Sequence, residues 1–563
     1  GRERMLSPRA DGLVSYGVAE FVAQEEMDRF TGYWWADDDL AVAYARVDEA
    51  PVAIEKRFEI YADRAEVIEQ RYPAAGKANA DVRLYVRQLD AEDAVEIELG
   101  PERDIYLARV DWLPDAAHLY VQRQSRDQRT LDLLEADVAS GKTRVTLTER
   151  SETWINLHKD LRVLDDGSAF VWASERSGYQ QLELRDRQGK LLRALTHGKF
   201  VVDEVLGIDD QARVVYYAAN AEDDREKHVY SVSLDGGPRK RLSRAPGWHE
   251  AVFSTDASVY VDSFSDENTP PQVRLHRNDG TELALLEGNA VDADHPYQPY
   301  RAAHRNPEFG TLTANDGQRL HYRLIKPLGF VASKRYPVVV RVYGGPHVQY
   351  VQRRWDERWG LFDQVLAQRG FVVFSLDNRG SARRGVAFEA PIHRKMGGPE
   401  VDDQMVGVRW LADQDFVDPK RIASFGWSYG GYMTAMLLAK HSDEIAAGVA
   451  VAPVSDWSLY DTHYTERYMD HPAQYVDAYR DSGVFAHLPG LTSKLFLVHG
   501  MADDNVLFTH STRLMAELQE QGTPFDLMTY PGGKHGLAGT ATRRHVFKAI
   551  VGWFERVLAD AAQ

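Results

Sequence analysis

The chain has 563 residues, of which 44% are hydrophobic and 27% are charged, and its formal net charge is −18. A chain of this length needs more than one hydrophobic core, and it contains no apolar run long enough to span a membrane. The negative charge argues against nucleic acid as a partner, and the absence of cysteine excludes disulfides, thiolate metal sites and cysteine nucleophiles. We expect neither a metal ion nor a cofactor.

Two adjacent glutamates, Glu25 and Glu26, lie near the start of the chain in the segment GVAEFVAQEEM. Nothing in the neighbouring residues sets them apart from ordinary solvated charges on a short helix. Consecutive side chains on an α-helix point about 100° apart. Both carboxylates would therefore converge on one ligand only if the backbone is irregular there.

Residues 1–300 are predicted to form short β-strands. An acidic turn followed by a strand recurs, as in WLPDAAHLYVQ and VLDDGSAFVWA, and the turn aspartates Asp115, Asp166, Asp210 and Asp256 lie 51, 44 and 46 residues apart. An all-β repeat of this length is typical of the four-stranded blades of a β-propeller. An irregular array of β-sandwiches is the alternative. Roughly five such repeats fit before residue 300.

Residues 301–563 follow a different pattern. RYPVVVRVYGG and GFVVFSLDNRG are continuous apolar runs ending in glycine, as expected of buried parallel strands, and helical stretches such as EVDDQMVGVRWLADQ lie between such runs. We therefore predict two domains, a β-propeller over residues 1–300 and a doubly wound, mostly parallel α/β sheet over residues 301–563.

The segment GWSYG around Ser428 matches G-x-S-x-G, with RIASF before it as a strand and YMTAMLLAKH after it as a helix. This strand–turn–helix context is that of the nucleophile elbow of α/β-hydrolases. A glycine-rich turn with an incidental serine is the alternative. A serine nucleophile needs a base and an orienting acid, which follow in the order Asp, His in this fold.

Candidates for these partners follow Ser428 in the chain. VHGMADDNV supplies Asp503 and Asp504, between which spacing does not choose, and YPGGKHG supplies His535. His499 precedes both aspartates, so the order disfavours it as the base. An oxyanion needs two donors. The backbone N–H of Tyr429 is one by position, and VYGGP brings a second candidate, Tyr343, which taken alone is more often a core residue.

The motifs VYGGP, GWSYGGYM, YTERYM and HGMADDNV, in one α/β domain after a β-propeller, resemble those of the dipeptidyl peptidase IV branch of the prolyl oligopeptidase family. The resemblance implies Ser428, Asp503 and His535 as a catalytic triad and the Tyr343 hydroxyl as the second oxyanion donor. It also implies a pocket for the residue before the cleaved bond, lined by Tyr429, Val454, Trp457, Tyr460, Tyr464 and Val506. An apolar aromatic pocket of this kind suits proline or alanine and offers no partner to a charge.

The resemblance also changes the interpretation of Glu25 and Glu26, because AEFVAQEEMDRFTGYWW matches the segment that binds the free amino terminus of the substrate. An ammonium group needs acceptors once it is desolvated. Asn505 resembles the residue that hydrogen-bonds the carbonyl of the first substrate residue. The resemblance thus implies a serine exopeptidase that releases Xaa-Pro and Xaa-Ala dipeptides, through an acyl-enzyme, from peptides with a free N-terminus.

Two other functions compete with this one. An acylaminoacyl peptidase or oligopeptidase would share the triad, but a blocked amino end has no charge for the glutamates to hold. A catalytically silent propeller scaffold would have lost the serine or its partners, and all three are present.

Three further expectations concern the whole protein. Animal members of the family carry cysteines and this chain has none, so we expect a bacterial relative in the periplasm or secreted. The family propeller has eight blades, so the propeller is expected to be incomplete at its N-terminal end, with an additional N-terminal portion of the same protein. A homodimer is expected from the family's habit and from an apolar stripe on the last helix, formed by Val546, Ile550, Trp553 and Phe554. Packing of this stripe against the domain's own sheet is the alternative.

Overall fold

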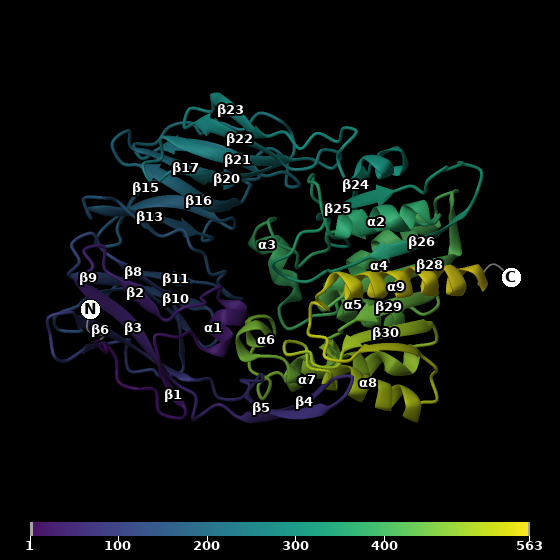
Figure 1. Ribbon diagram of the computed structural model, residues 1–563, viewed down its shortest axis with the longest axis horizontal. Helices are drawn as coiled ribbons and strands as arrows, with labels where there is room; N and C mark the ends of the chain where they lie inside the picture. Colours follow the sequence, from purple (N-terminus) through teal and green to yellow (C-terminus); the bar gives the residue numbers. More distant parts are fainter. Residues whose placement is uncertain (1–3, 561–563) are drawn as a thin grey trace.

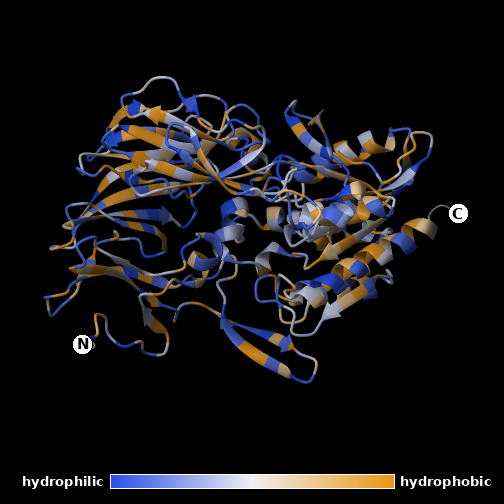
Figure 2. Ribbon diagram, turned by 45° about the horizontal axis from the view of Figure 1, so that its top comes forward, coloured by the Kyte–Doolittle hydropathy of each residue, from blue (hydrophilic) through white to orange (hydrophobic). Residues whose placement is uncertain are grey.

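The computed structural model describes residues 4–560, and Figure 1 shows two parts that face each other, an N-terminal arc of β-sheets and a C-terminal α/β region. In Figure 2 the strands of both parts are mostly hydrophobic and the connecting loops mostly hydrophilic. Among the described residues, no helix is long and apolar enough to cross a membrane.

Five sheets follow one another along the N-terminal part, and each is an antiparallel meander over most of its strands. The first contains β1 (Val14–Tyr16), β2 (Tyr33–Trp35), β3 (Ala41–Asp48), β6 (Asp81–Gln88) and β7 (Val95–Ile97). The second and third contain β8 (Ile105–Trp112), β9 (His118–Ser125), β10 (Thr130–Asp137) and β11 (Thr143–Arg150), then β12 (Arg162–Val163), β13 (Ala169–Ser174), β14 (Gln181–Asp186) and β15 (Leu191–Ala194). The fourth and fifth contain β16 (Val202–Asp209), β17 (Val214–Ala219), β18 (His228–Ser233) and β19 (Lys240–Arg241), then β20 (Trp248–Phe253), β21 (Val259–Ser265), β22 (Gln272–Arg277) and β23 (Glu282–Glu287).

The acidic turns that carry the repeat join the first two strands of four of these sheets. Asp115 accepts a hydrogen bond from the Ala117 N–H at 3.0 Å, and Asp166 accepts one from the Ser168 N–H at 2.9 Å. Such a bond from residue i+2 lets an aspartate stabilise its own turn. In the β16–β17 turn Asp209, rather than the predicted Asp210, caps the turn, by accepting from Ala212 at 2.7 Å.

Two elements of the propeller domain leave its sheets and approach the α/β domain. Helix α1 (Phe21–Glu26) lies between β1 and β2 and contacts α6 (Thr462–Met469). A hairpin of β4 (Ile54–Ile60) and β5 (Ala65–Arg71) forms a separate two-stranded sheet, which lies along the lower edge of Figure 1 near α7 and α8.

The α/β domain contains one eight-stranded sheet in the order β24-β25-β27-β26-β28-β29-β30-β31. The pairs β24–β25 and β25–β27 are antiparallel and the others are parallel. The strands are β24 (Glu308–Thr313), β25 (Arg319–Ile325), β26 (Tyr336–Arg341), β27 (Val372–Leu376), β28 (Val417–Trp427), β29 (Ala447–Val451), β30 (Lys494–Gly500) and β31 (Asp526–Tyr530). The order reverses at β26, as in a doubly wound sheet.

Helices cover both faces of this sheet and form two hydrophobic cores. One core contains side chains of α4 (Pro399–Ala412), α5 (Tyr429–Lys440) and α8 (Thr509–Glu520), and the other contains side chains of α2 (Trp359–Gln368) and α9 (Thr540–Asp560). The remaining helical segments are η1 (Gln298–Ala303), α3 (Val386–Glu389), η2 (Ala390–Ile392), η3 (Trp457–Leu459), α7 (Val476–Ser482) and η4 (Val484–Gly490).

The apolar stripe of α9 packs inside the chain. Val546, Ile550, Trp553 and Phe554 are each at most 2% exposed, and the Trp553 ring stacks on Phe496 of β30 at 5.4 Å. The stripe therefore covers the domain's own sheet and offers no surface to a second copy. The helical spacing identified an apolar face correctly, but the interpretation of that face as a dimer contact was wrong.

Candidate active site

Ser428 occupies the sharp turn between β28 and α5. Its backbone has φ 60° and ψ −118°, a conformation that a non-glycine residue adopts only under constraint. A Cβ at Gly426 would lie 2.1 Å from the Gly430 carbonyl oxygen, and one at Gly430 would lie 2.3 Å from that of Val342. A side chain at either glycine of the motif would therefore clash with backbone. The absence of these side chains lets the turn pack against Val342, which follows β26 and precedes Tyr343.

The structure pairs His535 with Asp503. His535 Nδ1 lies 2.9 Å from Asp503 Oδ2, and the Asp503 side chain is fully buried. Burial alone would raise the pKa of Asp503, but hydrogen bonds from His499 and His535 outweigh it and hold the pKa well below its usual range. Asp504, in contrast, is half-exposed and lies 3.4 Å from Lys534 Nζ.

Two contacts place these groups relative to the serine turn. His499 Nε2 lies 3.1 Å from Asp503 Oδ2, and the Ser511 hydroxyl lies 2.8 Å from His499 Nδ1. His499 therefore helps to fix the position of the Asp503 carboxylate. Trp427, the residue before Ser428, donates its indole N–H to the His535 carbonyl at 3.1 Å. The histidine loop is thereby held against the end of the strand that carries the serine.

Tyr343 follows β26 beside this turn. Its ring centroid lies 5.9 Å from that of Tyr429, and a Cβ at Gly345 would lie 2.7 Å from Tyr429 Cγ and 2.8 Å from Tyr343 Cε1. Only glycine fits between the two rings. Burial raises the pKa of Tyr343, so its hydroxyl remains a hydrogen-bond donor at neutral pH.

The predicted pocket residues lie together. Ring centroids are 5.4 Å apart for Tyr429 and Trp457, 5.9 Å for Trp457 and Tyr464, and 5.3 Å for Tyr460 and Tyr464. Val454 and Val506, which are 3% and 0% exposed, belong to the same hydrophobic core. The six side chains therefore form one apolar, aromatic cluster beside Ser428.

The two glutamates at the end of α1 contact different residues of the α/β domain. Asn505 Nδ2 donates to Glu25 Oε2 at 3.0 Å, whereas the Glu26 carboxyl hydrogen-bonds that of Asp461. Burial, and then Asp461, raise the pKa of Glu26, and burial raises the pKa of Asp461 to about 6. Two adjacent carboxyl groups of this kind share a proton near neutral pH.

Matches to known proteins show the family of this chain. The matching family models are described as "Dipeptidyl peptidase IV (DPP IV) N-terminal region", over residues 2–271, and "Prolyl oligopeptidase family", over residues 361–561. The chain is 30% identical to human dipeptidyl peptidase 8, over 94% of this chain and 68% of that protein. It belongs to the prolyl oligopeptidase family.

Other relatives of this dipeptidyl peptidase IV-like serine peptidase include bovine dipeptidyl peptidase 4, which is 27% identical over 95% of this chain and 73% of its own length. The crystal structure of Porphyromonas gingivalis dipeptidyl peptidase 4 has a TM-score of 0.92 at 28% identity, covering 97% of this chain and 77% of that one. The family, the fold class and the enzyme class predicted from the sequence are confirmed.

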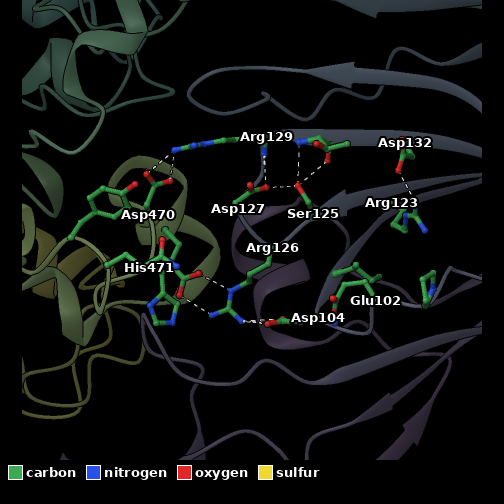
Figure 3. A pocket seen from close by; sticks show the side chains of 16 residues that line it. Glu102, Asp104, Arg123, Ser125, Arg126, Asp127, Arg129, Asp132, Asp470 and His471 are labelled. Carbon is green, nitrogen blue, oxygen red and sulfur yellow. Dashed lines mark hydrogen bonds and ion pairs between the residues drawn. The ribbon is translucent and has the colours of Figure 1, made fainter.

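In this peptidase α6 is attached to the propeller domain along its whole length. Arg126 contacts Glu466 through two bonds of 2.6 and 2.7 Å, and Arg129 contacts Asp470 at 2.7 and 2.9 Å. Figure 3 shows these ion pairs in the wall of an outer cavity of 650 Å³ between the two domains. The ion pairs of Arg126 and Arg129 form a seam between the domains that holds α6, and with it the pocket residue Tyr464.

Two functional neighbours escaped the sequence analysis. Asp461 caps α6 by accepting from the Tyr464 N–H at 3.0 Å, besides contacting Glu26. Glu400, at the start of α4, is fully buried, and it accepts a hydrogen bond from the Tyr429 hydroxyl at 2.8 Å. Burial raises the pKa of Glu400 to about 7. A signal existed only for Asp461, which stands in the sequence between the pocket residues Tyr460 and Tyr464.

Proposed function

We propose that this peptidase releases Xaa-Pro and Xaa-Ala dipeptides from free amino ends through an acyl-enzyme on Ser428. The Ser428 hydroxyl attacks the second carbonyl of the substrate while His535 Nε2 takes its proton, and Asp503 holds the opposite ring nitrogen. The Tyr429 N–H and the Tyr343 hydroxyl stabilise the oxyanion. His535 then gives the proton to the leaving amine, and water, activated by the same base, hydrolyses the ester to free the dipeptide.

One observation carries the proposal, namely that Asn505 contacts both Asp503 and Glu25. Its backbone N–H donates to Asp503 Oδ1 at 3.0 Å, while its side chain donates to Glu25 Oε2 at 3.0 Å. A single residue, Asn505, thus links an acceptor for an ammonium group to the triad aspartate. Two extended residues span about 7 Å. A substrate anchored at Glu25 and Glu26 therefore presents its second carbonyl, and no later one, to Ser428.

The pocket accounts for the second substrate residue. The rings of Tyr429, Trp457 and Tyr464 pack against one another and form an apolar surface for a proline ring. The Tyr460 hydroxyl donates to Asn505 Oδ1 at 2.9 Å. A charged side chain entering this pocket would lose its water without gaining a partner. Proline and alanine are the residues that fill it without such a penalty.

A panel of chromogenic substrates tests the proposal. We expect turnover of a free-amino Xaa-Pro substrate, slower turnover of its N-acetyl form, and little turnover of single-residue substrates. Ser428→Ala should abolish turnover, because the change removes only the attacking oxygen. If the N-acetyl substrate were cleaved as fast as the free one, the chain would instead be an acylaminoacyl peptidase or oligopeptidase.

We also propose a homodimer and a periplasmic or secreted location. The outer face of the β4–β5 hairpin, rather than α9, supports the dimer, because Ile54, Phe58 and Val67 are 48%, 60% and 55% exposed there. Apolar side chains exposed together on one hairpin favour a protein contact. Light scattering that finds only the monomer mass of 63.7 kDa at micromolar concentration would contradict the dimer.

A further inference from the structure

The β4–β5 hairpin of the propeller domain reaches the two loops that carry Asp503 and His535. At the end of β4 the Ile60 N–H donates to the Met501 carbonyl at 3.2 Å, and the Gly532 N–H donates to the Ile60 carbonyl at 2.7 Å. Met501 lies two residues before Asp503, and Gly532 lies three residues before His535. A single residue of the hairpin thus bridges both loops.

The hairpin geometry leaves Ile60 free to do this. Ile60 lies opposite Ala65 in the hairpin, while the bond that closes the turn joins the Tyr61 N–H to the Arg64 carbonyl at 2.8 Å. In an antiparallel pair, residues alternate between bonding each other and pointing their N–H and C=O outward. The polar groups of Ile60 point outward, so the bonds to the α/β domain do not compete with the hairpin's own.

A buried carboxylate strengthens this contact. Glu59 is 5% exposed on a hairpin whose outer face is exposed, and Lys534 Nζ lies 2.5 Å from its Oε1. Burial would raise the pKa of Glu59, but hydrogen bonds from Lys534, Tyr61 and Arg57 outweigh it and lower the pKa to about 2. The carboxylate is therefore ionised throughout the neutral range, and its ammonium partner belongs to the residue directly before His535.

The loop that carries His535 needs such a support. It contains three glycines between Tyr530 and Leu537, and Gly532 has φ +67°. A Cβ at Gly532 would lie 2.8 Å from Tyr61 Cδ1, so the loop is fitted closely to the hairpin. Glycine has more conformational freedom than any other residue. Hydrogen bonds from outside the loop therefore restrict a glycine-rich backbone more than an ordinary one.

We propose that Glu59 and Ile60 are positioning residues for the catalytic histidine, so that the propeller hairpin clamps the His535 loop against the Asp503 loop. The inference rests on the proposed roles of Ser428, Asp503 and His535. A base must stay within hydrogen-bond reach of the proton it removes, and small displacements reduce the rate steeply. The hairpin touches neither substrate nor reacting atoms and acts only through the two loops.

Four variants and a matched control test the clamp. Glu59→Gln removes the charge that holds Lys534, and Ile60→Pro removes the N–H donor without removing a hairpin bond. Lys534→Arg keeps the ion pair and should rescue function, in contrast to Lys534→Met. The matched control is Glu69→Gln, because Glu69 pairs with Lys56 at 3.2 Å on the same hairpin while 58% exposed.

For Glu59→Gln, Ile60→Pro and Lys534→Met we expect kcat on a free-amino Xaa-Pro substrate to fall about tenfold with KM within twofold, which corresponds to about 1.4 kcal/mol of activation free energy. Phosphonylation of Ser428 by a small serine-directed agent, which needs the base but no substrate anchor, should slow by the same factor. Lys534→Arg and Glu69→Gln should match the parent in both assays.

Two results would overturn the inference. If the variants melt at a lower temperature but keep the parent kcat per titrated active site, the hairpin only anchors the domains. If peptidase activity falls while phosphonylation is unchanged, the hairpin acts on the substrate and not on His535. Failure of the proposed function is separate, because it would show as turnover by Ser428→Ala, whatever the hairpin variants do.

Discussion

Replacing Asp461 by asparagine tests how the amino-terminal anchor works. In the parent, burial and the neighbouring Asp461 raise the pKa of Glu26, and burial raises the pKa of Asp461 to about 6, so we expect the pair to share a proton near neutral pH. Below about pH 6 both carboxyls become neutral, and the substrate ammonium loses part of its attraction. KM for a free-amino substrate should therefore rise as the pH falls through this range.

Asparagine removes the like charge while keeping the cap. Its side-chain oxygen can still accept the Tyr464 N–H bond at the start of α6, and its amide can donate to Glu26. A hydrogen bond to a charged group is worth roughly 1.5 to 3 kcal/mol, and one pKa unit is about 1.4 kcal/mol. Because Asp461 contributes to the raised pKa of Glu26, its replacement should lower that pKa and move the acid limb of the KM profile to lower pH.

The other charged groups near Glu26 do not change the expected direction of the shift. Glu25 raises the pKa of Glu26 and Arg467 lowers it, and both are present in parent and variant. The measurement is KM against pH for a free-amino Xaa-Pro substrate. Phosphonylation of Ser428 against pH is the control, because it reports the triad without an ammonium group. If the KM profile of Asp461→Asn coincides with that of the parent, the pair does not share a proton and the reasoning fails.

Three other predictions follow from the site. Asp503→Asn should reduce kcat by several orders of magnitude because it leaves His535 in the wrong tautomer, whereas Asp504→Asn should keep most activity, and steady-state kinetics of both variants would reveal a wrong choice of acid. Glu25→Gln should lower kcat/KM for free-amino substrates about tenfold or more and spare the N-acetyl form, and equal losses on both would contradict an ammonium anchor. Tyr429→Phe should reduce the free energy of unfolding by about 1 to 3 kcal/mol, because it removes one of the two hydrogen bonds to the buried Glu400 carboxyl and leaves the bond from the Gly397 N–H, and thermal denaturation measures this.

The fold was predictable from local pattern because each repeat carries its own signal. Turn aspartates such as Asp115 bond within their own turns, so their spacing is visible in the sequence. The nucleophile turn was equally predictable from the sequence. Close backbone contacts require glycine on both sides of Ser428, and the motif G-x-S-x-G contains these glycines. In one repeat the turn is stabilised by Asp209 and not by the predicted Asp210, but the position of the turn is unchanged.

What escaped prediction depends on contacts between distant segments. Glu59 alternates with exposed residues in KRFEIY and resembles a solvated charge until Lys534, 475 positions later, is placed beside it. Glu400 belongs to an ordinary amphipathic helix, and only the position of Tyr429 makes its carboxyl functional. The stripe on α9 shows the same limit, because helical spacing identifies an apolar face but not what covers it.

The proposed specificity would therefore depend on how the two domains meet, although the proposed triad lies wholly in one of them. Asp461 contacts Glu26 of the propeller domain, and Asn505 contacts Glu25, so the anchor exists only while α1 faces α6. The same helix carries Tyr464 of the pocket and is fixed to the second propeller sheet by Arg126. Loosening this seam would displace the anchor and one wall of the pocket together, because both depend on α6. If the proposed function holds, dipeptide length and proline preference should both be lost when the domains separate.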